Sequence, residues 1–142
     1  MVGPYGYCAD ISRAFVVGNK FNDEQKKLYS MAMEQIDYNS RLIKDGLSFK
    51  EFTEKSWSLP EDYYPNRYSV MVHGIGLCDE WPAIRYPTDG GERSGTFQKN
   101  MTITVESYIG KVGGKEGVKL EQQYLIGENG LELMSHHPLE DI

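Results

Sequence analysis

The strongest constraint on the fold is the last third of the chain, where apolar and polar residues alternate with the period of a β-strand. The segment MTITVESYIG at 101–110 alternates clearly, and VKLEQQYLI at 118–126 alternates less cleanly. The turn sequence ENG at 128–130 then favours a hairpin that LELMS closes. This third of the chain is therefore predicted to be β structure.

Two helices are predicted in the first half of the chain. Asn22 followed by Gln25 is typical of a capping box, and Gly46 is a stop signal, with an apolar face between them. A second capping pattern at Ser48 predicts a shorter helix that Pro60 ends. These segments form a helical pair between regions of β structure.

Two further segments have the composition of strands. YGYCADISRAFVVG at 5–18 is rich in aromatic and β-branched residues, and YSVMVHGIG at 68–76 indicates a buried strand that runs into a glycine turn. Residues 82–100 carry several prolines and glycines and are predicted to be a surface excursion. Strands at both ends with helices between them indicate an α+β fold, and 142 residues suffice for one domain.

Composition excludes several classes of partner and location. The net charge is −6 and no run of lysine or arginine occurs, which argues against nucleic acid or an anionic membrane surface as a partner. No apolar stretch reaches the ~20 residues of a membrane helix, and no signal peptide is recognisable, so a cytoplasmic location is expected. Cys8 and Cys78 are the only cysteines, which suits reduced thiols better than disulfides.

Four residues with metal-binding side chains lie in or beside the predicted strands. Side chains from neighbouring strands can converge, and three carboxylates with one imidazole suit divalent iron, manganese, cobalt, nickel or zinc. Taken singly, each has a simpler interpretation, since a strand glutamate usually faces solvent and a histidine beside glycines usually has a structural role. The four candidates are Asp10, His73, Glu106 and Glu121.

The order of the short motifs around these residues strengthens the metal interpretation. The segments DISRAF, HGIGL, TVES and GVKLEQQ resemble, in sequence and in order, the ligand-bearing segments of the pita-bread metallohydrolases. That family includes creatinase, aminopeptidase P, prolidase and methionine aminopeptidase. The resemblance implies a pita-bread fold and assigns metal binding to all four candidates.

The resemblance also implies that part of the family's architecture is absent. The family places a ligand aspartate on a strand about ten residues upstream of Asp10, which falls before Met1. We therefore expect residues 1–142 to be a partial catalytic domain, without the family's N-terminal domain and first ligand strand. An inactive fragment is one of the functional alternatives.

The glycine turn departs from the peptidase pattern of the family. Peptidases usually carry HGIGLxxHEEP, whereas this chain has HGIGLCDEWP, which is one residue shorter and aligns Asp79 with the second histidine. A carboxylate would repel the oxyanion of amide hydrolysis but could accept a proton from carbon. Asp79 is therefore the candidate catalytic base.

One branch of the family fits this exchange. The segments GPYGYCADISR, NRYSVMVHGIGLCDE, VESYIG and GKEGVKLEQQ are closely similar to the dimethylsulfoniopropionate lyases known as DddP. The resemblance implies cleavage to dimethyl sulfide and acrylate, with Asp79 as the base and Tyr68 beside it. Aromatic faces favour a sulfonium cation, so Trp81 is a candidate substrate-binding residue, with Tyr63 and Tyr64 near it in sequence.

The expected cofactor is a divalent transition metal, with iron first and nickel, manganese or zinc as alternatives. The expected partner is a small zwitterionic substrate, and the longer parent protein is expected to be a homodimer. The alternative activity is that of an Xaa-Pro dipeptidase or aminopeptidase with the same metal ligands.

Overall fold

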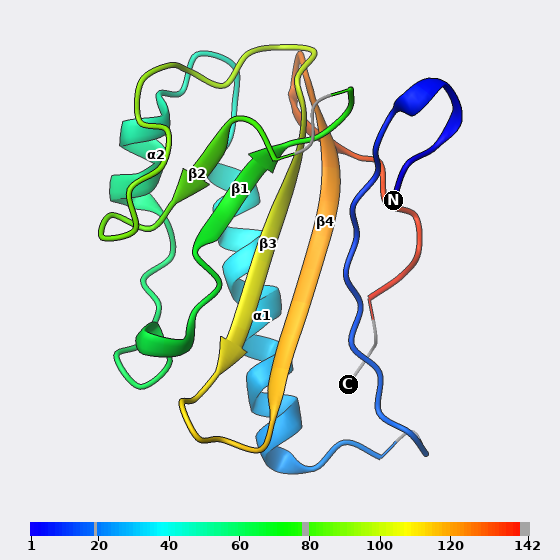
Figure 1. The fold of residues 1–142 in the computed structure, drawn as a ribbon, viewed down its shortest axis with the longest axis vertical. Coiled ribbons are helices and arrows are strands. Elements are labelled where there is room, and N and C mark those ends of the chain that lie inside the picture. The colour runs from blue at the N-terminus through cyan, green and yellow to red at the C-terminus, as the bar shows by residue number, and fades with distance from the viewer. Residues whose placement is uncertain (19, 78–79, 140–142) are drawn as a thin grey trace.

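The computed structural model describes residues 1–18, 20–77 and 80–139, which form one antiparallel sheet with two helices packed against it (Figure 1). The strand order is β2-β1-β3-β4-β5. Two short 3-10 turns, at Pro4–Gly6 and Tyr64–Asn66, complete the regular structure described. The helices are α1 (Asp23–Leu42) and α2 (Phe49–Lys55), and the strands are β1 (Val70–Gly74), β2 (Ala83–Arg85), β3 (Thr102–Gly110), β4 (Gly117–Gly127) and β5 (Gly130–Leu133).

Helix α1 begins where the sequence predicts. The side chain of Asn22 accepts a hydrogen bond from the backbone of Gln25, and the Gln25 side chain accepts one from the Asn22 backbone, which completes the capping box. The helix ends at Leu42, four residues before Gly46. Helix α2 is capped by Ser48 and ends at Lys55, so the predicted stop at Pro60 lies beyond its end.

The alternation of β3 and β4 places two kinds of side chain on opposite faces of the sheet. One face packs against α1 through aliphatic residues such as Val105, Ile109 and Leu120, all fully or almost fully buried. The other face carries polar residues and is the site face described below. Phe97 joins α2 to the same core, because its ring meets Phe49 edge to face at 4.9 Å between centroids.

Two predictions about secondary structure were wrong. Residues 5–18 do not form a strand, since the pairing in this region is limited to single bridges, Val2 with Cys8 and Ser12 with Glu121. The excursion at 82–100 contains a strand, β2, which pairs with β1 but is only three residues long and so left no alternation to detect. The other predicted strands and the hairpin between β4 and β5 are confirmed.

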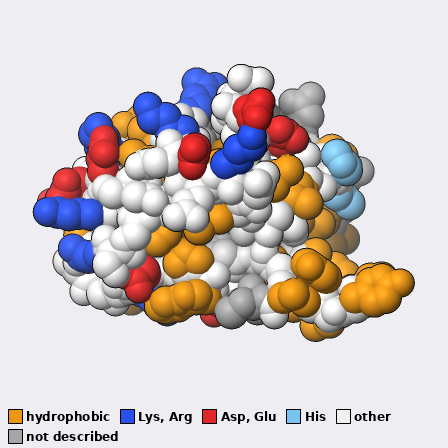
Figure 2. Space-filling model, turned by 90° about the horizontal axis from the view of Figure 1, so that it is seen from above, with side chains coloured by type: hydrophobic (Ala, Val, Ile, Leu, Met, Phe, Trp, Pro, Cys, Tyr) orange, Lys and Arg blue, Asp and Glu red, His pale blue; other side chains and the backbone are white. Residues whose placement is uncertain are grey.

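The surface mixes charge and exposed apolar groups. Figure 2 shows acidic and basic side chains interspersed on one side of the viewed face and hydrophobic side chains gathered on the other. The exposed hydrophobic residues include Met1, Val2 and Tyr5 in the N-terminal loop. Neither helix within the described ranges combines the length and apolar composition needed to cross a lipid bilayer.

Candidate metal centre

Two glutamates from adjacent strands face each other at the centre of the site. Glu106 on β3 and Glu121 on β4 are direct partners in the antiparallel register, so their side chains leave the same face of the sheet. They are only 2% and 3% exposed. Like charges at opposed positions destabilise a sheet, and burial raises the cost further, so this pair requires a positive partner.

His73 reaches the same face from β1. It pairs with Thr104 of β3, which lies two residues before Glu106 and therefore on the same face of the sheet. Its Nδ1 lies 2.9 Å from the carbonyl oxygen of Gly74, which can only accept, so Nδ1 donates and Nε2 is turned toward the carboxylates. Nε2 lies 3.3 Å from Oε1 of Glu121 and 3.8 Å from Oε1 of Glu106.

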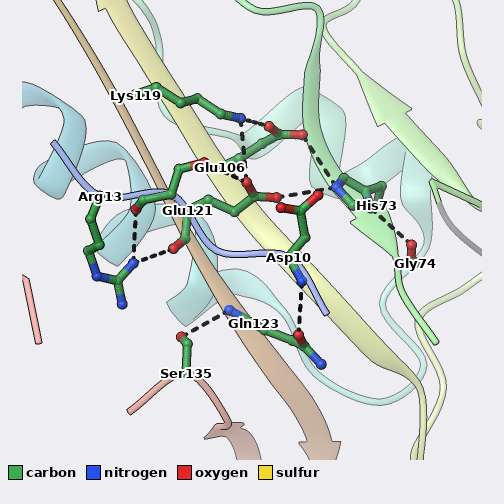
Figure 3. Close-up of polar contacts among 10 residues, drawn as sticks. Asp10, Arg13, His73, Gly74, Glu106, Lys119, Glu121, Gln123 and Ser135 are labelled. Atoms are coloured by element: carbon green, nitrogen blue, oxygen red, sulfur yellow. Dashed lines mark hydrogen bonds and ion pairs between the residues drawn. The ribbon is translucent and has the colours of Figure 1, made fainter. Parts of the chain in front are cut away.

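Asp10 completes the cluster from the extended N-terminal segment (Figure 3). One potential ligand atom from each of Asp10, His73 and Glu121 lies within 4.8 Å of the other two. The backbone N–H of Asp10 donates to the side-chain oxygen of Gln123 at 3.3 Å, which ties this segment to β4. Glu106 lies outside this group of three but beside it, through its contact with His73.

The glycine turn after His73 is set by close backbone contacts. Gly74 donates its N–H to the carbonyl of Pro82 at 2.9 Å, and the carbonyl of Trp81 occupies the space where a Cβ on Gly74 would lie. Gly76 has a φ of +146°, which residues other than glycine rarely adopt. These two glycines explain the local motif, because they let the turn fold back tightly and keep His73 at the end of β1.

Buried polar atoms on this face that make no hydrogen bond fit a bound cation. Four buried side-chain polar atoms among the described residues have no hydrogen-bond partner, and three of them belong to the site face. These three are Oγ1 of Thr104, Oε1 of Glu106 and Oε1 of Glu121. Both carboxylate oxygens point toward His73, so they and the imidazole offer a mixed oxygen and nitrogen donor set suited to a divalent transition metal.

Lys119 supplies a positive charge at the rim of the cluster. Its ammonium contacts Oε2 of Glu106 and lies 3.7 Å from Oε2 of Glu121 (Figure 3). It also sits over the ring of Tyr68, 4.2 Å from the centroid. Lys119 therefore balances part of the carboxylate charge, while the Oε1 atoms on the inner side are left without a hydrogen bond.

The pKa values of the cluster follow from burial and mutual attraction. Burial alone would lower the pKa of His73, but its contacts with Glu121 and the Gly74 carbonyl raise it above the ordinary value. Burial would raise the pKa of Glu121, yet His73, Lys119 and Ser12 together lower it. Burial lowers the pKa of Lys119 despite the nearby carboxylates. The carboxylate of Glu121 is therefore held in its anionic, metal-binding form.

The cluster lines an open cavity of about 360 Å³. Tyr68, predicted as an active-site neighbour, is part of its wall, and burial followed by the charges of Glu80 and Glu121 raises the pKa of its hydroxyl. The hydroxyl therefore stays protonated and can donate a hydrogen bond. The lining residues are Asp10, Ser12, Tyr68, His73, Glu80, Glu106, Tyr108, Lys119 and Glu121.

Four of these lining residues were not singled out from the sequence. Ser12, Tyr108 and Lys119 lie two residues from a predicted ligand on the same strand or segment, so the period of two could have found them. Glu80 follows the candidate base directly in sequence. Its backbone has a φ of +60°, which residue type alone does not reveal.

The predicted base and the other predicted aromatic residues are not found in the described wall of the cavity. Asp79, together with Cys78, lies outside the described residues, so its role stays a prediction. Trp81 is 60% exposed and does not line the cavity, and its role also stays a prediction. Tyr63 is buried in the core, and Tyr64 packs against Tyr86 at 5.7 Å, so neither of these two aromatics lines the cavity.

This cluster of carboxylates and one imidazole, on one face of a sheet backed by helices, is a candidate metal centre on an α+β fold. The family model of metallopeptidase family M24 matches residues 1–128. The chain therefore belongs to metallopeptidase family M24 and has the pita-bread fold predicted from its motifs.

Relatives from two functional groups are similar to this chain. The dimethylsulfoniopropionate lyase DddP of Roseovarius nubinhibens is 37% identical over 144 residues, covering 99% of this chain and 32% of the lyase. The Xaa-Pro dipeptidase of Pyrococcus furiosus is 31% identical over 134 residues, covering 91% of this chain and 36% of the dipeptidase. The crystal structure of X-Pro aminopeptidase from Thermotoga maritima matches with a TM-score of 0.73 and 29% identity, covering 94% of this chain and 37% of that one. The chain thus spans about a third of the length of these relatives.

Proposed function

We propose that this chain carries the active site of a metal-dependent dimethylsulfoniopropionate lyase, which forms dimethyl sulfide and acrylate. The observation that carries the proposal is the absence of a second imidazole from the described wall of the cavity, where His73 is the only histidine. His136 and His137 lie in the exposed C-terminal segment, where the His137 ring packs on Phe15 at 6.1 Å. The identity of 37% to a lyase of this kind supports the same conclusion.

Asp10, His73, Glu106 and Glu121 would hold the metal, with iron as the first expectation and nickel, manganese or zinc as alternatives. When bound, a divalent metal supplies Lewis acidity that stabilises negative charge on the substrate carboxylate. The residues around it supply the rest. The Oε1 atoms of Glu106 and Glu121, which make no hydrogen bond and face Nε2 of His73 at 3.8 and 3.3 Å, are the donor atoms that support this assignment.

The elimination needs one base and one donor. In the proposal, the Asp79 carboxylate accepts the proton alpha to the substrate carboxylate, and the C–S bond breaks as its electron pair leaves with the neutral sulfide. The remaining carbons form the double bond of acrylate, and Asp79 releases the proton to water. The Tyr68 hydroxyl, which stays protonated, would donate to the substrate carboxylate and orient it.

The two adjacent carboxylates Asp79 and Glu80 offer a matched test. The protein is loaded with iron(II), given dimethylsulfoniopropionate, and the headspace is analysed for dimethyl sulfide by gas chromatography. Asp79→Asn is expected to lower the rate by about 100-fold or more at unchanged metal content, as for loss of a general base. Glu80→Gln, which neutralises the next residue, is expected to retain activity within a few-fold.

A metal-loaded wild-type protein that releases no dimethyl sulfide overturns the proposal. Full activity in Asp79→Asn with loss in Glu80→Gln would instead assign the base to Glu80, which lines the cavity. The proposed assignment of Asp79 would then be wrong, although the reaction would stand.

The second candidate is an Xaa-Pro dipeptidase, favoured by the 31% identity to the enzyme of Pyrococcus furiosus. Its test is the hydrolysis of a dipeptide such as Ala-Pro by the manganese-loaded protein. The proline that is released measures the reaction. Turnover of the dipeptide with no dimethyl sulfide formed would establish this activity in place of the lyase. The absence of a second imidazole from the described cavity wall counts against it, since amide hydrolysis needs a donor to the oxyanion.

A further inference from the structure

Arg13 joins three segments that are far apart in the sequence. All of its N–H groups are used, and all of its acceptors are neutral oxygens. Nη1 donates to the carbonyls of Ser12 at 2.9 Å and Glu121 at 2.6 Å. Nη2 donates to Oε1 of Gln122 at 2.6 Å and to the carbonyl of His137 at 2.6 Å.

The same guanidinium holds the C-terminal segment. Nε donates to the carbonyls of His137 at 3.2 Å and Pro138 at 3.1 Å. Ser135, just before these residues, donates its hydroxyl to Oε1 of Gln122 at 2.6 Å, so the segment is fixed to β4 at a second point. Arg13 therefore fills the space between the N-terminal segment, β4 and residues 135–138.

Two candidate ligands depend on this junction. Residues 9–17 pair with β4 only through the Ser12 and Glu121 bridge, where the two backbones exchange hydrogen bonds of 3.4 and 3.1 Å. The Ser12 hydroxyl also donates to Oε2 of Glu121 at 3.0 Å. Asp10, two residues before Ser12, is held against β4 by its N–H bond to Gln123. The Ser12 and Glu121 bridge, whose two carbonyls both accept from Arg13, therefore contributes to the geometry of Asp10 relative to Glu121 together with these side-chain contacts (Figure 3).

We propose that Arg13 is the positioning residue of the metal centre, which holds Asp10 and Glu121 at ligand distance by fastening the Ser12 and Glu121 bridge to the C-terminal segment. Arg13 touches neither the cavity nor a candidate donor atom, so it acts through the backbone. A lysine cannot replace it, because one ammonium has three donors and lacks the planar fork that spans these acceptors. The inference rests on the metal centre of the proposed function and is independent of the reaction carried out there.

The test compares Arg13→Lys with Arg41→Lys in the metal-free chain. Arg41 is an exposed residue paired with Asp37 one helical turn away, so its replacement makes the same chemical change far from any ligand. Cobalt(II) is titrated into each protein, and its visible absorption reports both affinity and coordination geometry. Arg13→Lys is expected to weaken cobalt(II) binding about 10- to 100-fold, as for other residues that orient ligands, and to change the intensity of the visible bands. Arg41→Lys is expected to match the wild type.

Equal affinity and an equal spectrum for Arg13→Lys and wild type would overturn the proposal. If circular dichroism shows that Arg13→Lys is unfolded, Gln122→Met provides the second variant, because it removes the acceptor that Arg13 shares with Ser135 and keeps the aliphatic bulk. Gln122→Met is expected to weaken cobalt(II) binding several-fold, and unchanged binding in it would equally overturn the proposal. A wild-type chain that binds no cobalt(II) would remove the metal centre and this inference together, whereas a metal-binding chain without lyase activity would overturn only the proposed reaction.

Discussion

The two faces of β3 and β4 bury polar groups in opposite ways. On the helix face, Ser107 donates to Gln35 at 2.6 Å and Gln35 donates to the hydroxyl of Tyr86 at 2.6 Å. These three buried side chains therefore satisfy one another's hydrogen bonds. On the site face, Glu106 and Glu121 leave oxygens without a hydrogen bond. The helix face is therefore built to stabilise the fold, and the site face is built to accept a ligand at the expense of the metal-free state.

The largest expected effect comes from neighbouring residues that point to opposite faces. Leu120→Ala removes a fully buried side chain on the helix face and is expected to cost about 2–5 kcal/mol of unfolding free energy. Glu121→Gln should cost less than this in the metal-free protein, because it relieves the repulsion from Glu106 while it loses the attraction of His73 and Lys119, but it should abolish stabilisation by added metal. Urea unfolding with and without cobalt(II) measures both quantities. Equal responses of the two variants to metal would break the comparison.

Breaking the buried hydrogen bonds of the helix face is expected to cause a smaller loss of unfolding free energy. Gln35→Leu leaves the hydroxyls of Ser107 and Tyr86 without their partner, which should cost about 1–3 kcal/mol. Cobalt(II) affinity should remain within a few-fold of wild type, because Gln35 lies on the far side of the sheet from the ligands. A large loss of metal binding in a folded Gln35→Leu protein would show that the two faces are coupled.

The smallest effect is expected at Lys119, which bounds the site face. Lys119→Met removes the ammonium beside Glu106 and Glu121 and should lower the melting temperature of the metal-free protein by a few degrees. The same change should tighten cobalt(II) binding by roughly tenfold, because it removes a positive charge that repels the ion and that the solvent screens only in part. Weaker binding in Lys119→Met would mean that Lys119 orients Glu106 instead of competing with the metal.

The sequence predicts the parts of this architecture that local patterns determine. The capping box at Asn22 and the alternation of 101–110 correspond to α1 and β3, and the ordered motifs pointed to the family and the fold. Asp10, His73 and Glu121, chosen from their place in or beside β segments, lie together in the structure.

Interactions between distant segments limit what the sequence reveals. The N-terminal segment has strand composition, but it pairs with β4 only at the Ser12 and Glu121 bridge, and the Arg13 side chain that donates to both carbonyls of this bridge lies far from Glu121 in the sequence. Lys119 gives no signal in the sequence that it faces two glutamates, because that depends on the register between β3 and β4. The pairing of β2 with β1 likewise depends on the turn that closes between Gly74 and Pro82.

The most direct test of the central claim, that the site face is a divalent metal centre, is the metal content of the purified chain. The protein is dialysed against excess iron(II) without oxygen, freed of unbound ion, and analysed by plasma mass spectrometry beside Glu121→Gln. We predict at least one ion per wild-type chain and a large loss in Glu121→Gln, with both proteins folded by circular dichroism. Equal metal content in the two proteins, or none in the folded wild type, would contradict the account.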